Sequence, residues 1–330
     1  MASAETLALV GSESLIGREI RDLLSGNTLG QDLKLVAAGV EEVGKLTDLG
    51  GEPAILGALE EENLESARVI FLAGSPESAH RVRELAPRAH LIDLTYALED
   101  MANARLRAPM VEPAGYEVPA DSVHVIANAA AIAITVVLNR LHAERKITGA
   151  LAHVFEPASE RGVRGVEELQ QQTIGLLSFK GQPKEVFDAQ LAFNMLSRLG
   201  DEAPVPLEDS ELRIERHLAT LLSHSGHAPI PSLRVIQAPV FHGHSISLWI
   251  EFESNPGVSA IEDILDGAPV DVRAGDAEPP NVVGVAGQSG LAAGGITADR
   301  NHPRAAWLWI VADNLRLQAE NAISVAQELL

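Results

Sequence analysis

The sequence predicts an α/β protein with two domains: a Rossmann-type domain built on a parallel sheet, followed by an α+β domain. In the first part of the chain, buried strand patterns alternate with helices, which is typical of a parallel sheet with crossover connections. A glycine-bearing turn near the amino terminus joins the first strand to the first helix. After His142 the predicted strands become longer and the helices fewer, which favours an α+β domain.

Length supports the division into two domains. At 330 residues the chain is too long for one ordinary hydrophobic core. We expect the Rossmann-type domain at residues 1–127, completed by a C-terminal helix over 313–330 that packs back onto it. The α+β domain is expected at residues 128–312.

Composition indicates a globular protein and excludes several functions. Hydrophobic residues make up 46% and charged residues 22%, and the formal net charge of −21 disfavours nucleic acid and anionic membranes as partners. Cysteine is absent, which excludes disulfides, thiolate metal sites and thiol catalysis. No apolar run reaches transmembrane length and no basic signal-peptide flank is present, so a cytoplasmic protein is expected.

The first strand, Thr6 to Val10, leads into a tight turn and a helix from Arg18 to Ser25. A strand, a glycine turn and a helix cradle phosphates in dinucleotide-binding domains. Two of the three glycines of a G-x-x-G-x-x-G variant are present, since Ser14 holds the middle place. A plain βα turn explains the pattern equally well. The candidate cofactor-binding residues here are Gly11, Ser12, Glu13, Ser14, Leu15, Ile16 and Gly17.

The loop after the second strand, Leu33 to Ala38, bears on cofactor choice. It begins at Gly39, where a ribose 2′-phosphate would need cationic or hydroxyl groups. Glu41 and Glu42 would repel that phosphate, and Lys45 is the local cation. If either dinucleotide binds, NAD is favoured over NADP.

Further strands at Arg68 to Ala73 and His90 to Leu94 flank a helix from Pro76 to Leu85. The stretch from Val123 to His142 then reads as a strand, a turn at Asn128 and a buried helix. A helix that opens after a strand directs free N–H groups at an anion, a thiolate or an oxyanion. Alanines follow Asn128 at the start of this helix. A core helix behind a surface turn therefore explains the stretch as well as a catalytic centre does.

The second half of the chain has these predicted elements in order: a strand over Ile147 to Phe155, an amphipathic helix over Gly162 to Leu177, a long connection from Phe179 to Pro206, a helix over Glu208 to Leu222, two strands within Leu233 to Phe252, strands over Asn281 to Thr297 and Ala305 to Val311, and the last helix. Long antiparallel strands are expected here. Glu167, Glu168 and Gln170 to Gln172 are expected on the solvent side of their helix.

Histidines offer a candidate acid/base and a candidate metal site. His242 and His244 lie two apart on a predicted strand, and His224 and His227 are nearby in sequence. Zinc would accept such ligands, but no carboxylate completes a recognisable spacing, so we predict no metal. His244 as a lone acid/base is favoured over zinc, and a hydrogen-bonded strand residue remains the alternative.

These stretches resemble the aspartate-semialdehyde dehydrogenase family over nearly the whole chain. The matching pieces are Gly11 to Gly17, Ile126 to Asn128, Gly162 to Thr173, Phe193 to Asn194, Ala238 to Ser245 and Leu308 to Arg316. The resemblance implies a homodimer with a Rossmann domain and an α+β catalytic and dimerisation domain. It also implies NADP-dependent reduction of aspartyl phosphate to the semialdehyde, in amino-acid biosynthesis, through a cysteine thioester.

The family's working residues are mostly replaced in this chain. The resemblance puts Ala131 at the place of the nucleophilic cysteine, Glu156 at that of a glutamine, and Gln237 at that of the substrate-binding arginine. His244 retains the general base. The resemblance also puts Glu99 at or near the place of the phosphate-binding arginine, and Gly39 and Asn314 at cofactor contacts. Gln318 stands near a family glycine.

The replacements are similar to those of the Usg-type paralogues and leave three hypotheses. An active oxidoreductase is disfavoured because the nucleophile is missing. A catalytically silent dimer that binds a partner, a metabolite or a dinucleotide is favoured. Acid/base chemistry by Glu156 and His244 on an unknown neutral or cationic small molecule is the third.

Overall fold

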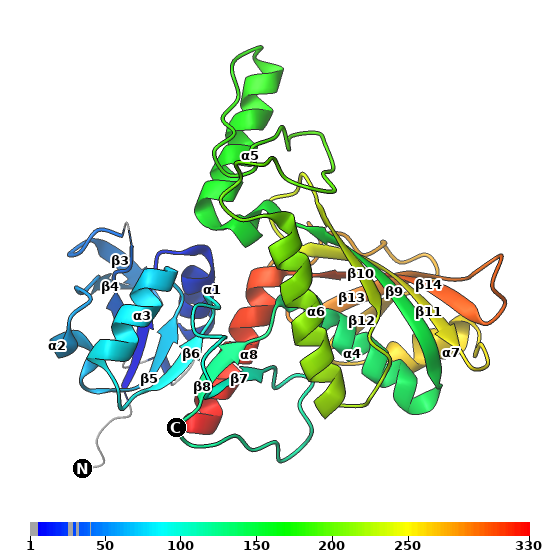
Figure 1. The fold of residues 1–330 in the computed structure, drawn as a ribbon, viewed down its shortest axis with the longest axis horizontal. Coiled ribbons are helices and arrows are strands. Elements are labelled where there is room, and N and C mark those ends of the chain that lie inside the picture. The colour runs from blue at the N-terminus through cyan, green and yellow to red at the C-terminus, as the bar shows by residue number, and fades with distance from the viewer. Residues whose placement is uncertain (1–5, 26–28, 31–32, 40) are drawn as a thin grey trace. The chain divides into compact units, whose positions relative to one another are not determined.

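The computed structural model describes residues 6–25, 29–30, 33–39 and 41–330 (Figure 1). The chain forms two compact units, one of residues 1–127 with 318–330 and one of residues 128–317. The first unit therefore ends between Ala127 and Asn128 and resumes at Gln318, where the sequence had suggested a return at Asp313. The functional names of the two domains stay a prediction.

The first unit contains a six-stranded parallel sheet in the order β2-β1-β5-β6-β8-β7. Its strands are β1 Thr6–Val10, β2 Leu33–Val36, β5 Ala67–Leu72, β6 His90–Asp93, β7 Ala104–Arg107 and β8 Val123–Ile126. The chain starts in the interior of the sheet and winds outward in both directions, which is the doubly wound Rossmann arrangement. The predicted α/β fold class is confirmed.

Helices cover both faces of this sheet. On one face, α1 (Leu15–Leu24) contributes Ile20 and Leu24, and the end of α8 (Asn314–Leu329) contributes Ala322. On the other face, α3 (Pro76–Leu85) buries Ala79 and Val82. The sequence had not predicted the short helix α2 (Glu61–Leu64), β7, or the antiparallel hairpin of β3 (Leu46–Leu49) and β4 (Glu52–Ile55).

The second unit contains a six-stranded mixed sheet in the order β10-β9-β11-β14-β13-β12. Its strands are β9 Ile147–Glu156, β10 Ser232–Gln237, β11 His244–Phe252, β12 Val270–Arg273, β13 Leu291–Ala298 and β14 Ala305–Ala312. The expectation of antiparallel strands is wrong at both edges, where β10 runs parallel to β9 and β12 to β13. The strand predicted from Asn281 begins only at Leu291, because turns with left-handed glycines at Gly287 and Gly290 precede it.

One face of this sheet is covered by helices. The helix α4 (Ala129–Glu144) is apolar on nearly every side and packs against β9, β11 and β14, with α6 (Leu207–His224) and α7 (Val258–Leu265) beside it. Buried and partly exposed residues alternate along β11. The partly exposed side chains on the opposite face include Phe155, Trp249, Trp307 and Trp309.

The helix α5 (Gly162–Leu177) organises the long connection that follows it (Figure 1). Two side chains expected on its solvent side, Glu168 and Gln172, are buried. Glu168 accepts hydrogen bonds from the main-chain N–H groups of Val186 and Phe187, and Gln172 accepts from Leu191 and Ala192. The prediction is wrong because this polar face packs on polar main chain, which helical periodicity does not distinguish from solvent.

Candidate functional site

Neighbouring strand ends bring three of the predicted catalytic positions together. Glu156 ends β9 and Gln237 ends β10, and the two residues are direct partners in the parallel pair. His244 begins the antiparallel β11, so it lies at the same end of the sheet. The side-chain amide of Gln237 donates a hydrogen bond of 2.8 Å to the main-chain carbonyl of Glu156.

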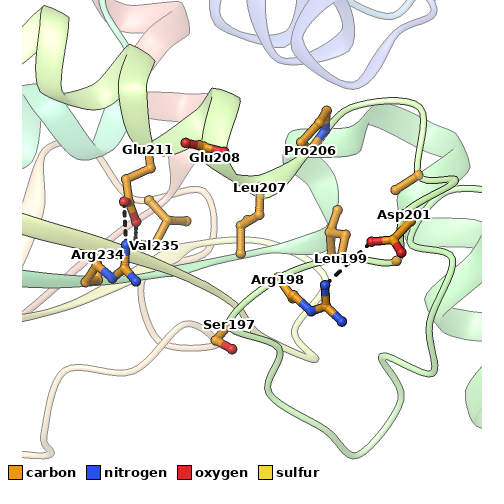
Figure 2. A pocket seen from close by; sticks show the side chains of 12 residues that line it. Ser197, Arg198, Leu199, Asp201, Pro206, Leu207, Glu208, Glu211, Arg234 and Val235 are labelled. Carbon is orange, nitrogen blue, oxygen red and sulfur yellow. Dashed lines mark hydrogen bonds and ion pairs between the residues drawn. The ribbon is translucent and has the colours of Figure 1, made fainter.

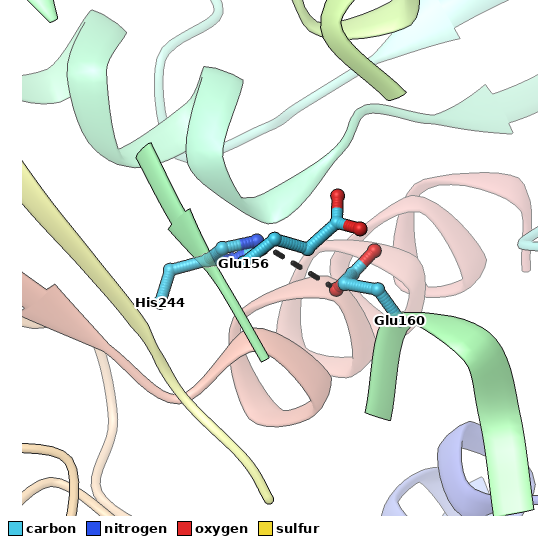
Figure 3. Close-up of side chains that lie close together, drawn as sticks. All are labelled: Glu156, Glu160 and His244. Carbon is cyan, nitrogen blue, oxygen red and sulfur yellow. Dashed lines mark ion pairs between the residues drawn. The ribbon is translucent and has the colours of Figure 1, made fainter. Parts of the chain in front are cut away.

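A short 3-10 helix after β9, Ala158–Arg161, adds two groups that sequence reasoning missed. Glu160 Oε1 lies 3.9 Å from His244 Nε2, and Arg161 donates a 3.0 Å hydrogen bond to Glu156 Oε1. Figure 3 shows Glu156, Glu160 and His244 close together. The sequence signal that could have identified Glu160 and Arg161 is the presence of charged residues soon after the end of a buried strand.

Burial controls the charge of this cluster. Glu156 and His244 are fully buried. Burial raises the pKa of Glu156, against the opposing effect of Arg161, and it raises the pKa of Glu160 as well. Burial also lowers the pKa of His244 to about 4. At neutral pH His244 is therefore an uncharged imidazole whose nitrogen lone pair can coordinate a ligand, and burial makes it a weak base.

Asn314 joins the same cluster from the start of α8. Its Oδ1 accepts from the main-chain N–H of Gly243 at 2.9 Å, and its Nδ2 donates to Glu160 Oε1 at 2.7 Å. The side chain is fully buried beside Ser159. The structure thus places Asn314 next to Glu160, while its cofactor role stays a prediction.

Ala131 lies within the first turn of α4 and is fully buried. The side chain of Asn128 accepts from the main-chain N–H of Ala130 at 2.9 Å, so one N–H group of this helix start is already capped. The main-chain N–H of Asn128 donates to His217 Nδ1 at 2.9 Å. The first three residues of α4 are alanines, so this helix start carries no nucleophilic side chain.

Close packing of the neighbouring main chain explains the two glycines in the turn after β1. A Cβ on Gly11, which has a φ of 89°, would come within 2.3 Å of Gly74, and one on Gly17 within 2.1 Å of the Gly11 carbonyl oxygen. Ser14 caps α1 by accepting from the Gly17 N–H at 2.9 Å. Ser12 is buried, whereas Leu15 and Ile16 in the first turn of the helix are partly exposed.

Two carboxylates occupy the surroundings of this turn. Glu41 accepts hydrogen bonds of 3.0 Å from the main-chain N–H groups of Glu13 and Ala38. Glu13 pairs with Arg21 at 2.7 Å and Lys45 at 2.9 Å. Burial raises the pKa of Glu13, but hydrogen bonds from Lys45 and Arg21 outweigh it and hold that pKa at about 2. Lys45, the predicted local cation, is thus paired with Glu13.

Several predicted residues are not members of the strand-end cluster. His224 and His227 are exposed, and His242 is partly buried. Among the described residues, the group with spacing suitable for a metal is Glu156, Glu160 and His244. Gly39, with a φ of 61°, and Glu99 lie in the first unit, as does Gln318, whose amide donates to the Ala127 carbonyl.

A surface pocket of about 480 Å³ lies between the long connection, α6 and β10 (Figure 2). Four of the charged side chains that line it form two ion pairs, and exposed Glu208 is the fifth. Glu211 accepts from Arg234 at 3.0 Å and from the Val235 N–H at 2.9 Å, and Arg198 lies 3.5 Å from Asp201. The pocket therefore differs from the strand-end cluster, where buried polar atoms remain unsatisfied.

A doubly wound sheet followed by a mixed sheet with polar strand ends is the two-domain architecture of semialdehyde dehydrogenases. Residues 138–317 match the family described as semialdehyde dehydrogenase, dimerisation domain. The chain belongs to the semialdehyde dehydrogenase family, and it is similar to aspartate-semialdehyde dehydrogenases and to USG-1 protein homologs.

Similar proteins cover the whole chain. The aspartate-semialdehyde dehydrogenase of Rickettsia bellii is 26% identical over 100% of this chain and 99% of its own length. A USG-1 protein homolog of Pseudomonas aeruginosa is 28% identical over the same shares. The structure of a probable aspartate-semialdehyde dehydrogenase from Pseudomonas aeruginosa covers 98% of both chains with a TM-score of 0.85 and 27% identity.

A more distant structure shares the fold alone. The Candida albicans aspartate semialdehyde dehydrogenase, solved with NADP, has a TM-score of 0.66 at 13% identity and covers 99% of this chain and 98% of its own.

Within the described residues, no helix is both long and apolar enough to span a bilayer.

Proposed function

We propose that this protein is a member of the family that has lost the dehydrogenase reaction and acts as a dimeric binding protein. The observation that carries this proposal is the fully buried Ala131 at the position of the missing cysteine, in a chain without any cysteine. Without a thiolate no thioester forms, and the covalent pathway is removed.

The residues at the place where the family binds the substrate's anionic groups support the same proposal. Gln237 stands where the family binds the substrate carboxylate with arginine, and its amide is already engaged with the Glu156 carbonyl. Arg161, a cation within the cluster, is paired with Glu156. Loss of a bidentate arginine contact to a carboxylate costs about 1.5 to 3 kcal/mol of substrate binding. A neutral or cationic ligand suits this cluster better than an acyl phosphate.

Activity measurements test this proposal. The purified protein is expected to show no phosphate-dependent oxidation of aspartate semialdehyde with NAD or NADP. The denatured protein serves as control, and the sample must be free of host dehydrogenase. Turnover well above that control would overturn the proposal.

Membership in this family implies NAD(P) binding by the Rossmann-type domain, and we propose that NAD is preferred. The support is Glu41, whose carboxylate rests on the main-chain N–H groups of Glu13 and Ala38. Acidic residues after the second strand suit a ribose hydroxyl and repel a 2′-phosphate. Charge repulsion over about 5 Å at an effective dielectric of 20 is roughly 3 kcal/mol per pair of unit charges.

We also propose that the dimerisation domain forms a homodimer through the sheet face that the helices leave open. Phe155 and Trp309 pack at 5.7 Å between ring centroids on that face. Trp249 and Trp307 are both tethered there through hydrogen bonds to Asp299. A broad face of large aromatic residues is typical of protein interfaces.

A further inference from the structure

We propose that Glu156, Glu160 and His244 form a binding site for one divalent transition-metal ion, of the Zn²⁺ or Mn²⁺ type. This inference goes beyond the proposed function, because it holds for metal binding whether or not any reaction takes place. It also replaces the expectation that the protein has no metal site.

The spacing of the three side chains suits one ion. One ligand atom from each residue lies within 4.8 Å of the others, and His244 Nε2 and Glu160 Oε1 are 3.9 Å apart. Two ligands of one metal ion, each bonded at about 2.1 Å, are roughly 3 to 4 Å apart. Small side-chain rotations therefore bring the three atoms to coordination distance.

The unsatisfied atoms of the cluster are the second, independent observation. Both ring nitrogens of His244 and Oε2 of Glu156 are buried without a hydrogen-bond partner in the described part of the chain. Buried polar atoms are nearly always paired, because leaving one unpaired costs about 1 to 3 kcal/mol. A metal ion would coordinate Glu156 Oε2 and one His244 nitrogen directly.

Neighbouring groups hold the ligand atoms in place. Arg161 binds Glu156 Oε1 and leaves Oε2 free, while Asn314 donates to Glu160 Oε1 at 2.7 Å. His244 is fixed by its strand pairing with Ala312. Such outer hydrogen bonds orient the ligands in protein metal sites. The ion pair between Arg161 and Glu156 satisfies only Oε1 of that carboxylate. It leaves Glu156 Oε2 and both nitrogens of the His244 imidazole without a partner in the described part of the chain.

The ligand set indicates the class of ion. Imidazole nitrogen suits Zn²⁺, and carboxylate oxygen suits Mn²⁺, whereas Mg²⁺ prefers oxygen ligands and keeps its water. The carboxylates of Glu156 and Glu160 would supply two negative charges against the +2 ion. Three protein ligands leave at least one position for water or an oxygen donor of a small molecule.

The test uses the full chain after removal of bound metal with a chelator. Titration calorimetry with Zn²⁺ or Mn²⁺ is expected to give one site per chain, with much weaker binding of Mg²⁺. Glu160→Gln and His244→Gln are expected to weaken that site at least tenfold. The exposed His227→Gln and Glu208→Gln serve as matched controls and should leave it unchanged.

A spectroscopic measurement guards against misfolded variants. Electron spin echo spectroscopy of the wild-type protein with one equivalent of Mn²⁺ is expected to show coupling to an imidazole nitrogen. Absence of a stoichiometric site, absence of that coupling, or equal losses in the control variants would overturn the proposal. Because none of these readouts depends on dehydrogenase turnover, they are independent of the proposed function.

Discussion

The main-chain N–H of Glu13 donates a hydrogen bond to the side chain of Glu41 at 3.0 Å. A carboxylate therefore lies against the glycine turn at which a Rossmann domain binds the anionic part of its cofactor. Glu41 comes from the loop after β2, so it links the two segments that would surround the adenosine ribose.

Glu41→Arg should raise NADP affinity about tenfold or more and NAD affinity much less. The substitution removes one repelling charge and supplies an attracting one for the 2′-phosphate. Dissociation constants for both nucleotides, measured by calorimetry, check this. Glu84→Arg, which makes the same change of charge at an exposed glutamate near the end of α3, is the control and should leave both affinities unchanged. Equal gains for NAD and NADP, or a wild-type preference for NADP, would show that this loop does not face the ribose.

The homodimer should dissociate when the open sheet face is charged. Trp309→Arg places a cation among aromatic side chains, and burying it against a second copy would be costly. Light scattering at micromolar concentration should give a dimer for the wild type and a monomer for this variant. Leu46→Arg, at an exposed leucine of the first unit, should remain dimeric. A monomeric wild type contradicts the proposed interface.

A thiol introduced at Ala131 should be unreactive. Ala131→Cys gives a chain with a single cysteine, in a first helical turn that is fully buried. Its reaction with an aromatic disulfide reagent should be at least a hundredfold slower in the native protein than in urea, because access requires local opening. Rapid labelling of the native protein would mean that this helix start is open to ligands.

Acid should destabilise the first unit partly through His124. This histidine is buried and accepts a hydrogen bond from Arg107, and burial, with the Arg107 charge, lowers its pKa from 6.5 to about 4. The folded state keeps His124 neutral while the unfolded chain binds a proton. The stabilisation is therefore complete above about pH 6.5 and is lost as the pH falls toward 4, up to about 3 kcal/mol.

Urea unfolding between pH 7 and pH 4.5 measures this dependence. His124→Gln should reduce the slope of the unfolding free energy with pH, whatever its effect at pH 7. The exposed His80→Gln should retain the wild-type slope. An unchanged slope in His124→Gln would rule out this histidine as a source of acid sensitivity.

Local signals in the sequence were sufficient for much of the fold. The helix Pro76–Leu85 was predicted with its observed bounds, because Ser75 caps it in a reciprocal hydrogen-bonded box before a proline. The β3–β4 hairpin was missed because its strands are short and none of their residues is buried, which leaves no apolar periodicity.

The candidate site was predictable only in part. His244 was predicted from the histidine pattern and from the resemblance, Glu156 and Gln237 from the resemblance alone, and strand pairing explains why they meet. Glu160 and Arg161 were missed because a 3-10 turn folds them back onto the strand end, and neither strand nor helix periodicity describes such a turn. Contacts of this kind depend on tertiary structure, which a local pattern does not specify.

The two buried side chains of α5 have a consequence for cleavage by proteases. Residues 178–206 contain no helix and only one isolated strand bridge, Leu196 with Gln237, yet Glu168 and Gln172 hold their main chain at four N–H groups. The amide hydrogens of Val186 and Leu191 should therefore exchange as slowly as those of a helix. A single cut near Phe187 would loosen the segment that bridges Gln237 through Leu196, so cleavage and loss of order at the strand ends should proceed together.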